Sequence, residues 1–250
     1  MGTADSLVDH VVIVTGGAGG IGSVIARRFA EAGARVVILE NAEAKAQAGV
    51  AALPGTGHLA VVAAVDDSPT LTAAADTIAR HYGRLDVLVN CAGITRPVAH
   101  DDLDGLDDDL IDAIFRVNWR GPFACVRAFK NLLAADAGGV VVNISSIAAT
   151  TGLGSNVAYC ASKAALNAMT VSLARVLAPA IRMVSVAPGW VEGEYAKRMD
   201  PAILEGHRSK TPLGRLAQGE DVAEAVLAVV TSLRFSTGCI IPVDGGRPLL

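Results

Sequence analysis

Apolar residues follow two alternating patterns along this chain. Short, nearly continuous apolar runs rich in valine, isoleucine and leucine are typical of buried strands. Between them, apolar residues recur every three or four positions, as on the buried face of a helix. The first pattern predicts strands over 10–15, 35–40, 58–65, 85–90, 140–144, 181–186 and 239–243, and the second predicts helices over 21–32, 42–53, 69–81, 106–133, 157–177 and 221–231.

This alternation predicts an α/β fold with one seven-stranded parallel sheet and helices on both faces, because right-handed crossovers join parallel neighbours. Such a sheet is doubly wound, of the Rossmann type. No linker, repeat or low-complexity stretch interrupts the pattern, so we expect 1–250 to be a single domain. Residues 188–218 mix glycine, proline and charge. We interpret them as an inserted substrate loop or lid beyond the sixth strand, where such sheets bind ligands.

Composition excludes several classes of function. The chain has 250 residues, of which 52% are hydrophobic and 18% charged, with a net charge of −4. Basic residues are not clustered, so we expect no nucleic-acid partner. No apolar run is long enough to span a membrane, and the N-terminus has no signal-peptide pattern. The four cysteines and five histidines lack metal-ligand or C-x-x-C spacing, so we expect no metal site and a reducing, cytoplasmic location.

A glycine-rich turn, 15–22, joins the first strand to the first helix. Gly16, Gly20 and Gly22 allow a tight turn and a close backbone approach. The helix that follows presents free N–H groups and a positive dipole end, which suit a pyrophosphate. In an alternating βα chain this turn predicts dinucleotide binding.

Glu40 ends the second strand, eighteen residues after Gly22. A carboxylate there can accept hydrogen bonds from the adenosine ribose and repel a 2′-phosphate. Positions 17–19 and 41–42 carry no Arg or Lys. These features favour NAD over NADP, although a solvated carboxylate at a strand end is the alternative interpretation.

Tyr159 and Lys163 are four residues apart in a predicted helix and so share a face. A cation beside a phenol favours the phenolate, which could then exchange protons with an alcohol or a carbonyl oxygen. Ser146, thirteen residues upstream of the tyrosine, could donate a hydrogen bond to the same oxygen. Taken alone, Tyr-x-x-x-Lys is also compatible with an ordinary helix, and its neighbours in the sequence decide between the two.

With these motifs together, the chain resembles the short-chain dehydrogenase/reductase family over essentially its whole length. The resemblance rests on the turn 15–22, on Asn-Cys-Ala-Gly at 90–93, on Tyr-x-x-x-Lys, on Pro-Gly at 188–189 and on Val-Asp-Gly-Gly at 243–246. It implies a catalytic tetrad of Asn118, Ser146, Tyr159 and Lys163. The serine is Ser146 rather than Ser145 because of the spacing to the tyrosine.

The resemblance also assigns roles. Tyr159 would be the general acid/base, Lys163 would lower its pKa and hold the nicotinamide ribose, Ser146 would orient the substrate oxygen, and Asn118 would position Lys163 through a water-linked relay. Hydride would pass between the nicotinamide and the substrate carbon. The implied cofactor contacts are Gly16, Ala18, Gly19, Gly20, Ile21, Gly22, Glu40, Val65, Asn90, Ala92, Gly93, Tyr159, Lys163, Pro188, Gly189 and Val191.

Three positions depart from the family pattern. Cys91 replaces a second asparagine, and Ala64 stands where many members have an aspartate that contacts adenine, with Asp66 as a possible substitute. Gly193 stands where a cofactor-binding threonine is common. We therefore expect the loop after the sixth strand to make weaker contacts with the cofactor, or backbone contacts through Val191.

The sequence predicts a pocket for a modest, partly apolar alcohol or ketone, lined by Ile94, Leu153 and Trp190, although Trp190 could instead pack the lid onto the body. The basic residues Arg96, Lys197 and Arg198 are more typical of a solvated surface than of an anion site. The resemblance implies a homo-oligomer, a tetramer or a dimer, through helices 106–133 and 157–177. The alternatives are an NADPH-dependent 3-oxoacyl-carrier-protein reductase, an epimerase or isomerase with bound NAD, and a non-catalytic nucleotide-binding protein.

Overall fold

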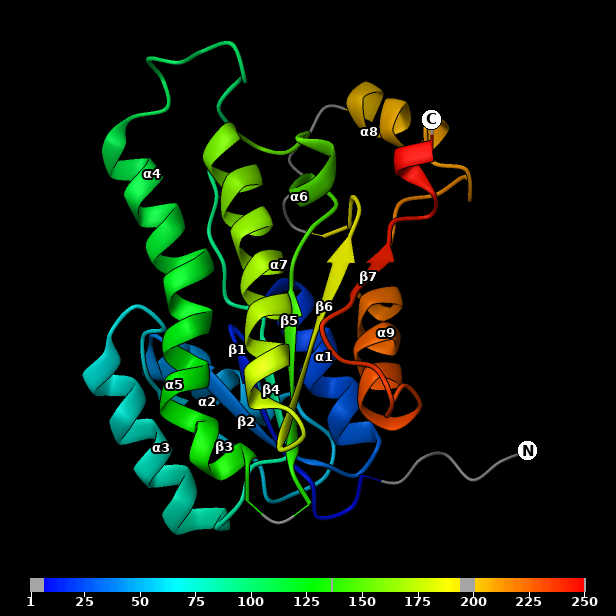
Figure 1. Cartoon of the computed structure of the whole chain (residues 1–250). Helices are drawn as coiled ribbons and strands as arrows, with labels where there is room; N and C mark the ends of the chain where they lie inside the picture. The colour runs from blue at the N-terminus through cyan, green and yellow to red at the C-terminus, as the bar shows by residue number, and fades with distance from the viewer. Residues whose placement is uncertain (1–6, 136, 194–200, 250) are drawn as a thin grey trace.

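A computed structural model describes residues 7–135, 137–193 and 201–249. Its core is a seven-stranded sheet in the order β3-β2-β1-β4-β5-β6-β7, with every neighbouring pair parallel (Figure 1). The chain order reverses between β1 and β4, which leaves a crevice beyond the carboxyl ends of these two strands. The strands are β1 (Val11–Thr15), β2 (Arg35–Glu40), β3 (Leu59–Val62), β4 (Val87–Asn90), β5 (Gly139–Ile144), β6 (Ile181–Pro188) and β7 (Ile240–Val243).

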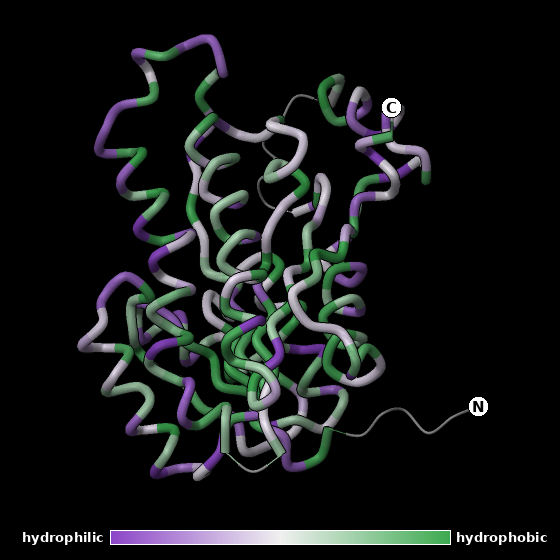
Figure 2. The backbone as a smooth tube through the Cα atoms, in the orientation of Figure 1, coloured by the Kyte–Doolittle hydropathy of each residue, from purple (hydrophilic) through white to green (hydrophobic). Residues whose placement is uncertain are grey.

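Helices cover both faces of the sheet and bury two apolar cores. Side chains of α1, α2 and α9 pack on one face and those of α3, α5 and α7 on the other. The inner strands are apolar on both sides (Figure 2), as expected for a parallel sheet between two helical layers. These helices are α1 (Gly20–Glu31), α2 (Glu43–Ala51), α3 (Ser68–Tyr82), α5 (Gly121–Leu133), α7 (Val157–Leu177) and α9 (Gly219–Thr231). The predicted doubly wound α/β fold is confirmed.

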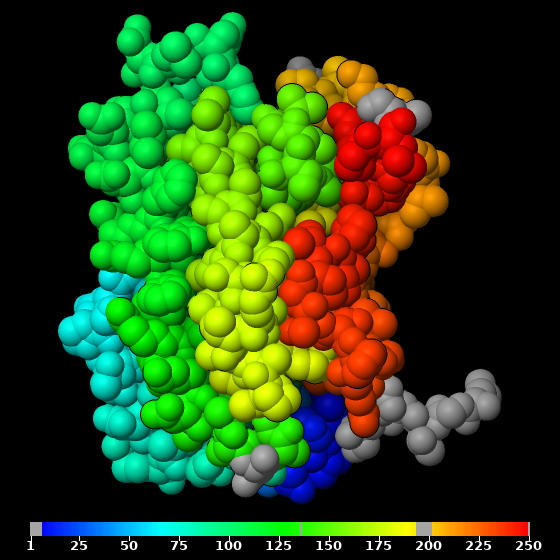
Figure 3. Space-filling view, viewed as in Figure 1, coloured from blue at the N-terminus to red at the C-terminus, as the bar shows by residue number. Residues whose placement is uncertain are grey.

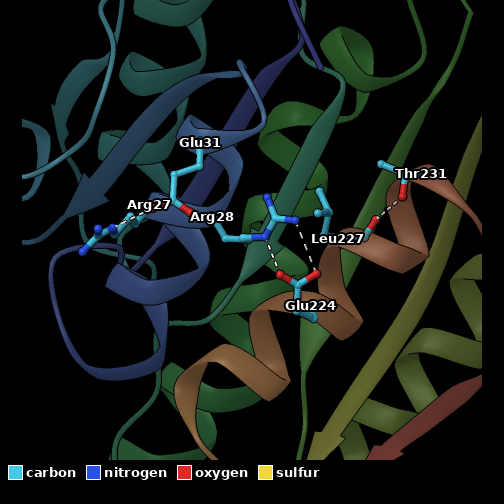
Figure 4. Close-up of polar contacts among 6 residues, drawn as sticks. All are labelled: Arg27, Arg28, Glu31, Glu224, Leu227 and Thr231. Atoms are coloured by element: carbon cyan, nitrogen blue, oxygen red, sulfur yellow. Dashed lines mark hydrogen bonds and ion pairs between the residues drawn. The ribbon is translucent and has the colours of Figure 1, made fainter. Parts of the chain in front are cut away.

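Helices α1 and α9 are also joined at the surface. The Arg28 side chain pairs with Glu224 across the two helices, and Arg27 pairs with Glu31 along α1 (Figure 4). Exposed ion pairs of this kind contribute at most about 1 kcal/mol. Burial of residues such as Phe29 and Val226 therefore holds the two helices together.

The structure is helical over 108–133, close to the predicted 106–133, with a π-helical turn within the segment. Helix α4 (Asp108–Phe115) begins after Asp107, whose carboxylate caps Leu110 N–H at 2.8 Å. It continues as a π-helical turn, η1 (Arg116–Arg120), which leads into α5. Pro122 lies in the first turn of α5, directly after this π turn. The irregularity of this helical segment is thus the π turn.

The sequence patterns did not predict three short elements near the carboxyl ends of the strands. Helix α6 (Ala148–Thr151) follows β5, helix α8 (Pro201–Ser209) lies within 188–218, and a 3₁₀ turn, η3 (Arg247–Leu249), ends the described chain. The interpretation of Lys197 and Arg198 as surface residues falls outside the described residues. Among the described helices, none is both long and apolar enough to cross a membrane.

Candidate active site

The glycine-rich turn lies at the reversal of the strand order. Gly16 has φ +66°, and a Cβ there would lie 3.0 Å from Ala92 Cα, so the turn closes tightly on the loop after β4. A Cβ on Gly22 would meet Gly16 O at 2.2 Å. By contrast, a Cβ on Gly19 or Gly20 would meet nothing within 4 Å. The turn is therefore tightly packed at Gly16 and Gly22 and open at Gly19 and Gly20.

The open side of this turn is the amino end of α1. Its N-cap, Gly19, supplies no side-chain cap, and the first turn of α1 carries no acidic residue. The first N–H groups and the positive end of the helix dipole thus face the open space beside Gly19 and Gly20. A cradle without side chains that presents N–H donors fits the pyrophosphate of a dinucleotide.

Glu40 lies at the end of β2 beside this turn. Its Oε1 accepts a hydrogen bond from Ala18 N–H at 3.2 Å, and the side chain is half-buried. This hydrogen bond holds the carboxylate at the edge of the glycine turn, where a residue that binds the adenosine ribose would have to lie. Asp66 forms an ion pair, with its carboxylate 3.1 Å from Arg116 Nε. Asp66 thus does not simply replace the aspartate that many family members carry at the Ala64 position.

Asn118 lies in the π turn and is fully buried. Its Oδ1 accepts from Ile94 N–H at 2.8 Å, and its Nδ2 donates to Ile94 O at 3.0 Å and to Ser162 Oγ at 3.3 Å. A Cβ on Gly93 would be 3.3 Å from Asn118 Oδ1 and 3.8 Å from Lys163 Nζ. The asparagine therefore fixes the backbone of the loop after β4 beside the lysine.

Tyr159 and Lys163 come from the first two turns of α7. Asn156 caps this helix by accepting from Tyr159 N–H at 2.7 Å. The buried Lys163 ammonium donates to Ile144 O at 2.7 Å, and its Nζ lies 5.8 Å from the centroid of the Tyr159 ring. The two side chains share one face of α7, as the spacing predicts.

Ser146 follows β5 and reaches the same tyrosine. The Ser146 hydroxyl acts to lower the pKa of the Tyr159 phenol, and its Oγ accepts from Ala148 N–H at 3.1 Å. Ser145 is buried instead, with its Oγ 3.4 Å from Lys163 O. Of the two serines, Ser146 is the one that meets the phenol.

Burial sets the protonation of this pair. It raises the pKa of Tyr159 above its ordinary value, and the bond to Ser146 opposes that rise. Burial also lowers the pKa of Lys163 to about 8, against a smaller opposing effect of Cys91. Burial of the phenol is the largest effect on the pKa of Tyr159, so the net pKa is raised, and the expected lowering by Lys163 stays a prediction.

A buried polar network that the sequence analysis did not identify supports the site. Asn90 Nδ2 donates to Asn143 Oδ1 at 2.8 Å, Asn143 Nδ2 donates to Thr170 Oγ1 at 2.8 Å, and Thr170 Oγ1 meets Ser185 Oγ at 2.8 Å. The network joins β4, β5 and β6 to α7. Asn90 Oδ1 is buried without a partner among the described residues. The available signal was polar residues inside otherwise apolar strands.

The Pro-Gly and Asp-Gly-Gly motifs meet each other. Gly189 N–H donates to Val243 O at 2.9 Å, and a Cβ on Gly189 would be 3.0 Å from Asp244 Cα. Val191 forms an isolated parallel bridge with Ala217. A Cβ on Gly193 would meet nothing within 4 Å.

The three substrate candidates lie in different surroundings. Ile94 and Leu153 are exposed, at 41% and 75%, on the loops after β4 and β5. Trp190 stacks on His207 of α8, with ring centroids 4.0 Å apart. The tryptophan therefore has the packing role that was the alternative interpretation, and its substrate role stays a prediction. Among the described residues, no His, Cys, Asp and Glu side chains gather as a metal site would require.

Known proteins are similar to this chain over nearly its whole length. Residues 16–247 match the family model described as enoyl-(acyl carrier protein) reductase. A solved structure described as a putative short-chain dehydrogenase/reductase from Burkholderia xenovorans is similar with a TM-score of 0.89 at 36% identity, over 98% of this chain and 100% of that one. The chain belongs to the short-chain dehydrogenase/reductase family. The resemblance inferred from the motifs is confirmed.

Other members of the short-chain dehydrogenase/reductase family are similar along their full length. The granaticin polyketide synthase putative ketoacyl reductase 2 of Streptomyces violaceoruber is 40% identical over 96% of each chain. The structure of the 3-ketoacyl-(acyl-carrier-protein) reductase from Brucella melitensis, complexed with NADH, has a TM-score of 0.89 at 30% identity over 97% of this chain and 99% of that one. This chain is thus an oxidoreductase of a family that binds nicotinamide cofactors and acts on small molecules.

Proposed function

We propose that this short-chain dehydrogenase/reductase transfers hydride between NAD(H) and a secondary alcohol or ketone, with Tyr159 as the general acid/base. The observation that carries the proposal is the placement of a buried Lys163 beside Tyr159, with Nζ 5.8 Å from the centroid of the ring, in a chain that also has the open glycine turn. The nicotinamide supplies the hydride when it is bound. The side chains supply position and protons.

The protonation of the pair suits carbonyl reduction at neutral pH. Because its pKa is raised, the Tyr159 phenol keeps its proton and can donate it to the substrate oxygen as the carbonyl carbon gains hydride. Ser146 donates a second hydrogen bond to that oxygen. The products are an alcohol and a phenolate, which regains its proton from water. Alcohol oxidation is the reverse, with the phenolate as base.

Lys163 and Asn118 hold this arrangement. With a pKa of about 8, roughly nine in ten Lys163 side chains are charged at pH 7, so the ammonium can stabilise the phenolate and donate to a ribose hydroxyl. Asn118 acts through the Ile94 backbone, which it fixes in both directions. We therefore assign Asn118 a positioning role.

Glu40 supports NAD as the cofactor. Its carboxylate lies at the rim of the cradle, where it would accept from a ribose hydroxyl and repel a 2′-phosphate. The 30%-identical Brucella melitensis reductase was solved with NADH, which agrees with this choice. We assign the cofactor site to the glycine turn, Glu40, Val65, Asn90, Ala92, Gly93, Pro188, Gly189 and Val191.

A second candidate is an NADPH-dependent 3-oxoacyl-carrier-protein reductase. It is favoured by the ketoacyl reductase that is 40% identical and by the structure of the 3-ketoacyl-(acyl-carrier-protein) reductase. Direct titration of the protein with NADH and with NADPH separates the two proposals. Tighter NADH binding supports the first, and tighter NADPH binding supports the second.

Helices α5 and α7 suggest a homo-oligomer, either a dimer or a tetramer. They lie side by side on one face of the molecule (Figures 1 and 3) and expose Phe123, Val157, Val171 and Val176. Trp119 and Phe123 stack there, with Arg127 over the Phe123 ring. Light scattering of the protein and of Val176→Glu tests this assignment.

The four free cysteines support our proposal of a reducing, cytoplasmic location.

A further inference from the structure

His207 joins three segments of the chain at the carboxyl end of the sheet. It lies in the last turn of α8, and its ring stacks on Trp190, with centroids 4.0 Å apart and an interplanar angle of 26°. Trp190 comes directly after Gly189, at the end of β6. On the other side, Arg247 of the C-terminal turn reaches both the ring and the carbonyl of His207. Figure 1 shows α8 beside the C-terminus.

The contact with Arg247 fixes the protonation of the His207 ring. Arg247 Nη2 lies 3.2 Å from His207 Nδ1, and Arg247 Nη1 donates to His207 O at 3.3 Å. A guanidinium has only donors and keeps its proton at any physiological pH. Nδ1 must therefore accept, which requires a neutral imidazole with its proton on Nε2. In a protonated ring, Nδ1 would carry a hydrogen that faces an N–H of Arg247, and the hydrogen bond between the two side chains would be lost.

Neighbouring contacts hold the same three segments together. Thr211 Oγ1 donates to His207 O at 2.8 Å, and Leu213 N–H donates to Gly245 O at 3.1 Å. The turn after α8 is thus bound to the C-terminal segment beside the histidine. We call the contacts of His207 with Trp190 and Arg247 the α8 anchor.

The charges around the α8 anchor oppose protonation of His207. Burial, Arg247 and Lys210 lower the pKa of His207 below its ordinary value of about 6.5. Arg208, the other cation of this turn, is paired with Glu192 and Glu205. The carboxyl end of α8 favours a cation, but Arg247 already donates there. A positive imidazole would therefore face two cations, one from each adjoining segment.

We propose that the α8 anchor is a pH-sensitive contact, in which neutral His207 holds α8 against Trp190 and the C-terminal turn and protonated His207 releases it. Because protons bind the released form more tightly, the anchor is fully stable above about pH 6.5 and loses stability as pH falls below that value. Trp190 adjoins Gly189, so release disturbs the loop that we assign to the cofactor and substrate. This last step rests on the proposed function, whereas the contact itself does not.

The contact is tested without any substrate. We would follow the five histidines by NMR during a pH titration and assign His207 with His207→Asn. The proposal predicts a midpoint below 6.5 that moves upward in Arg247→Leu. Arg80→Leu, which removes a guanidinium from the exposed surface of α3, should leave the midpoint unchanged. An ordinary midpoint, or one that is the same in Arg247→Leu, overturns the proposal whatever the activity of the protein.

The consequence for catalysis is tested by separating KM from kcat. Between pH 7.5 and 5.5 the neutral fraction of a free histidine falls about tenfold, so the substrate KM should rise up to about tenfold in the wild type. His207→Asn keeps an acceptor near the Nδ1 position but cannot be protonated, and its KM should be nearly flat. His207→Phe keeps a stacking ring without an acceptor, and its KM should be high at both pH values.

The two proposals fail in different ways. A protein that turns over no carbonyl, yet shows the predicted NMR shift in Arg247→Leu, contradicts the proposed function and keeps the anchor. A protein that turns over with a pH-independent KM, or in which His207→Asn retains the wild-type rise, contradicts the catalytic consequence of the anchor.

Discussion

Glu40 Oε1 accepts a hydrogen bond from Ala18 N–H at 3.2 Å, so the acid that ends β2 is tied to the turn that would cradle the cofactor. Under the proposed function, Glu40 would have two separable roles, to hold the turn and to repel a 2′-phosphate. Hydrogen bonds to charged groups contribute roughly 1.5–3 kcal/mol. We expect Glu40→Ala to reduce the preference for NADH over NADPH about 10- to 100-fold, measured as the ratio of kcat/KM values.

Glu40→Gln separates the two roles. A glutamine keeps an oxygen for Ala18 N–H and removes the charge. It should therefore raise kcat/KM for NADPH while the affinity for NADH falls less than in Glu40→Ala. If the ratio of kcat/KM for NADH to kcat/KM for NADPH is the same in the wild type and in both variants, Glu40 does not bind the ribose.

Tyr159→Phe should reduce turnover about 10²- to 10⁴-fold, because it removes the proton donor and leaves the ring in place. Affinity for NADH, measured by fluorescence titration, should change little. Tyr82→Phe is the matched control, since its hydroxyl donates to Gly57 O far from the site. Near-full kcat in Tyr159→Phe would show that another group moves the proton.

The Lys163 ammonium gives the reaction a pH limit. With a pKa of about 8, lowered by burial, Lys163 loses its charge as pH rises through 8, and with it the stabilisation of the phenolate. We expect kcat for carbonyl reduction to fall above pH 8. Lys163→Arg stays charged, so its lower kcat should show no such fall. A wild-type rate that stays constant up to pH 9.5 would contradict this role.

The lowered pKa of Lys163 also makes the stability of the protein depend on pH. The unfolded chain binds the Lys163 proton more tightly than the folded chain, so this group raises the free energy of unfolding as pH increases from about 8 to 10.5. Urea denaturation of Lys163→Met should show a weaker rise over this window than the wild type. Parallel curves for the two proteins would argue against a buried ammonium.

Gly19 tests the cradle itself. A Cβ at this position meets no protein atom within 4 Å, and its φ of −132° is open to any residue. Gly19→Ala should leave the melting temperature nearly unchanged and weaken NADH binding at least tenfold, because the methyl group projects into the cradle. Gly206→Ala, at an equally open position in α8, should leave NADH binding unchanged. Unaltered affinity in Gly19→Ala would place the pyrophosphate elsewhere.

Periodicity predicted the sheet because its strands are apolar on both faces, and both Arg35–Glu40 and Val157–Leu177 have the predicted bounds. It could not predict the π turn around Asn118, since a change of hydrogen-bond register leaves the apolar spacing almost intact. Helix α8 was missed because Pro201 and Gly206 indicate a loop, whereas contacts with Trp190 and Arg247 hold it.

Motif spacing likewise selected Ser146 over Ser145 but could not show that burial raises the pKa of Tyr159. Spacing places a cation near the phenol, whereas the cost of burying the phenol depends on packing from β5 and α7. The buried network from Asn90 to Ser185 also depends on the order of the strands, which no local pattern reveals.

The most direct test of the central claim is NADH oxidation at 340 nm with a panel of small ketones, run with NADPH in parallel and with Tyr159→Phe as the control. We predict turnover that is faster with NADH and lost in the variant. Tight NADH binding without turnover of any ketone, or equal rates in the wild type and Tyr159→Phe, would contradict it.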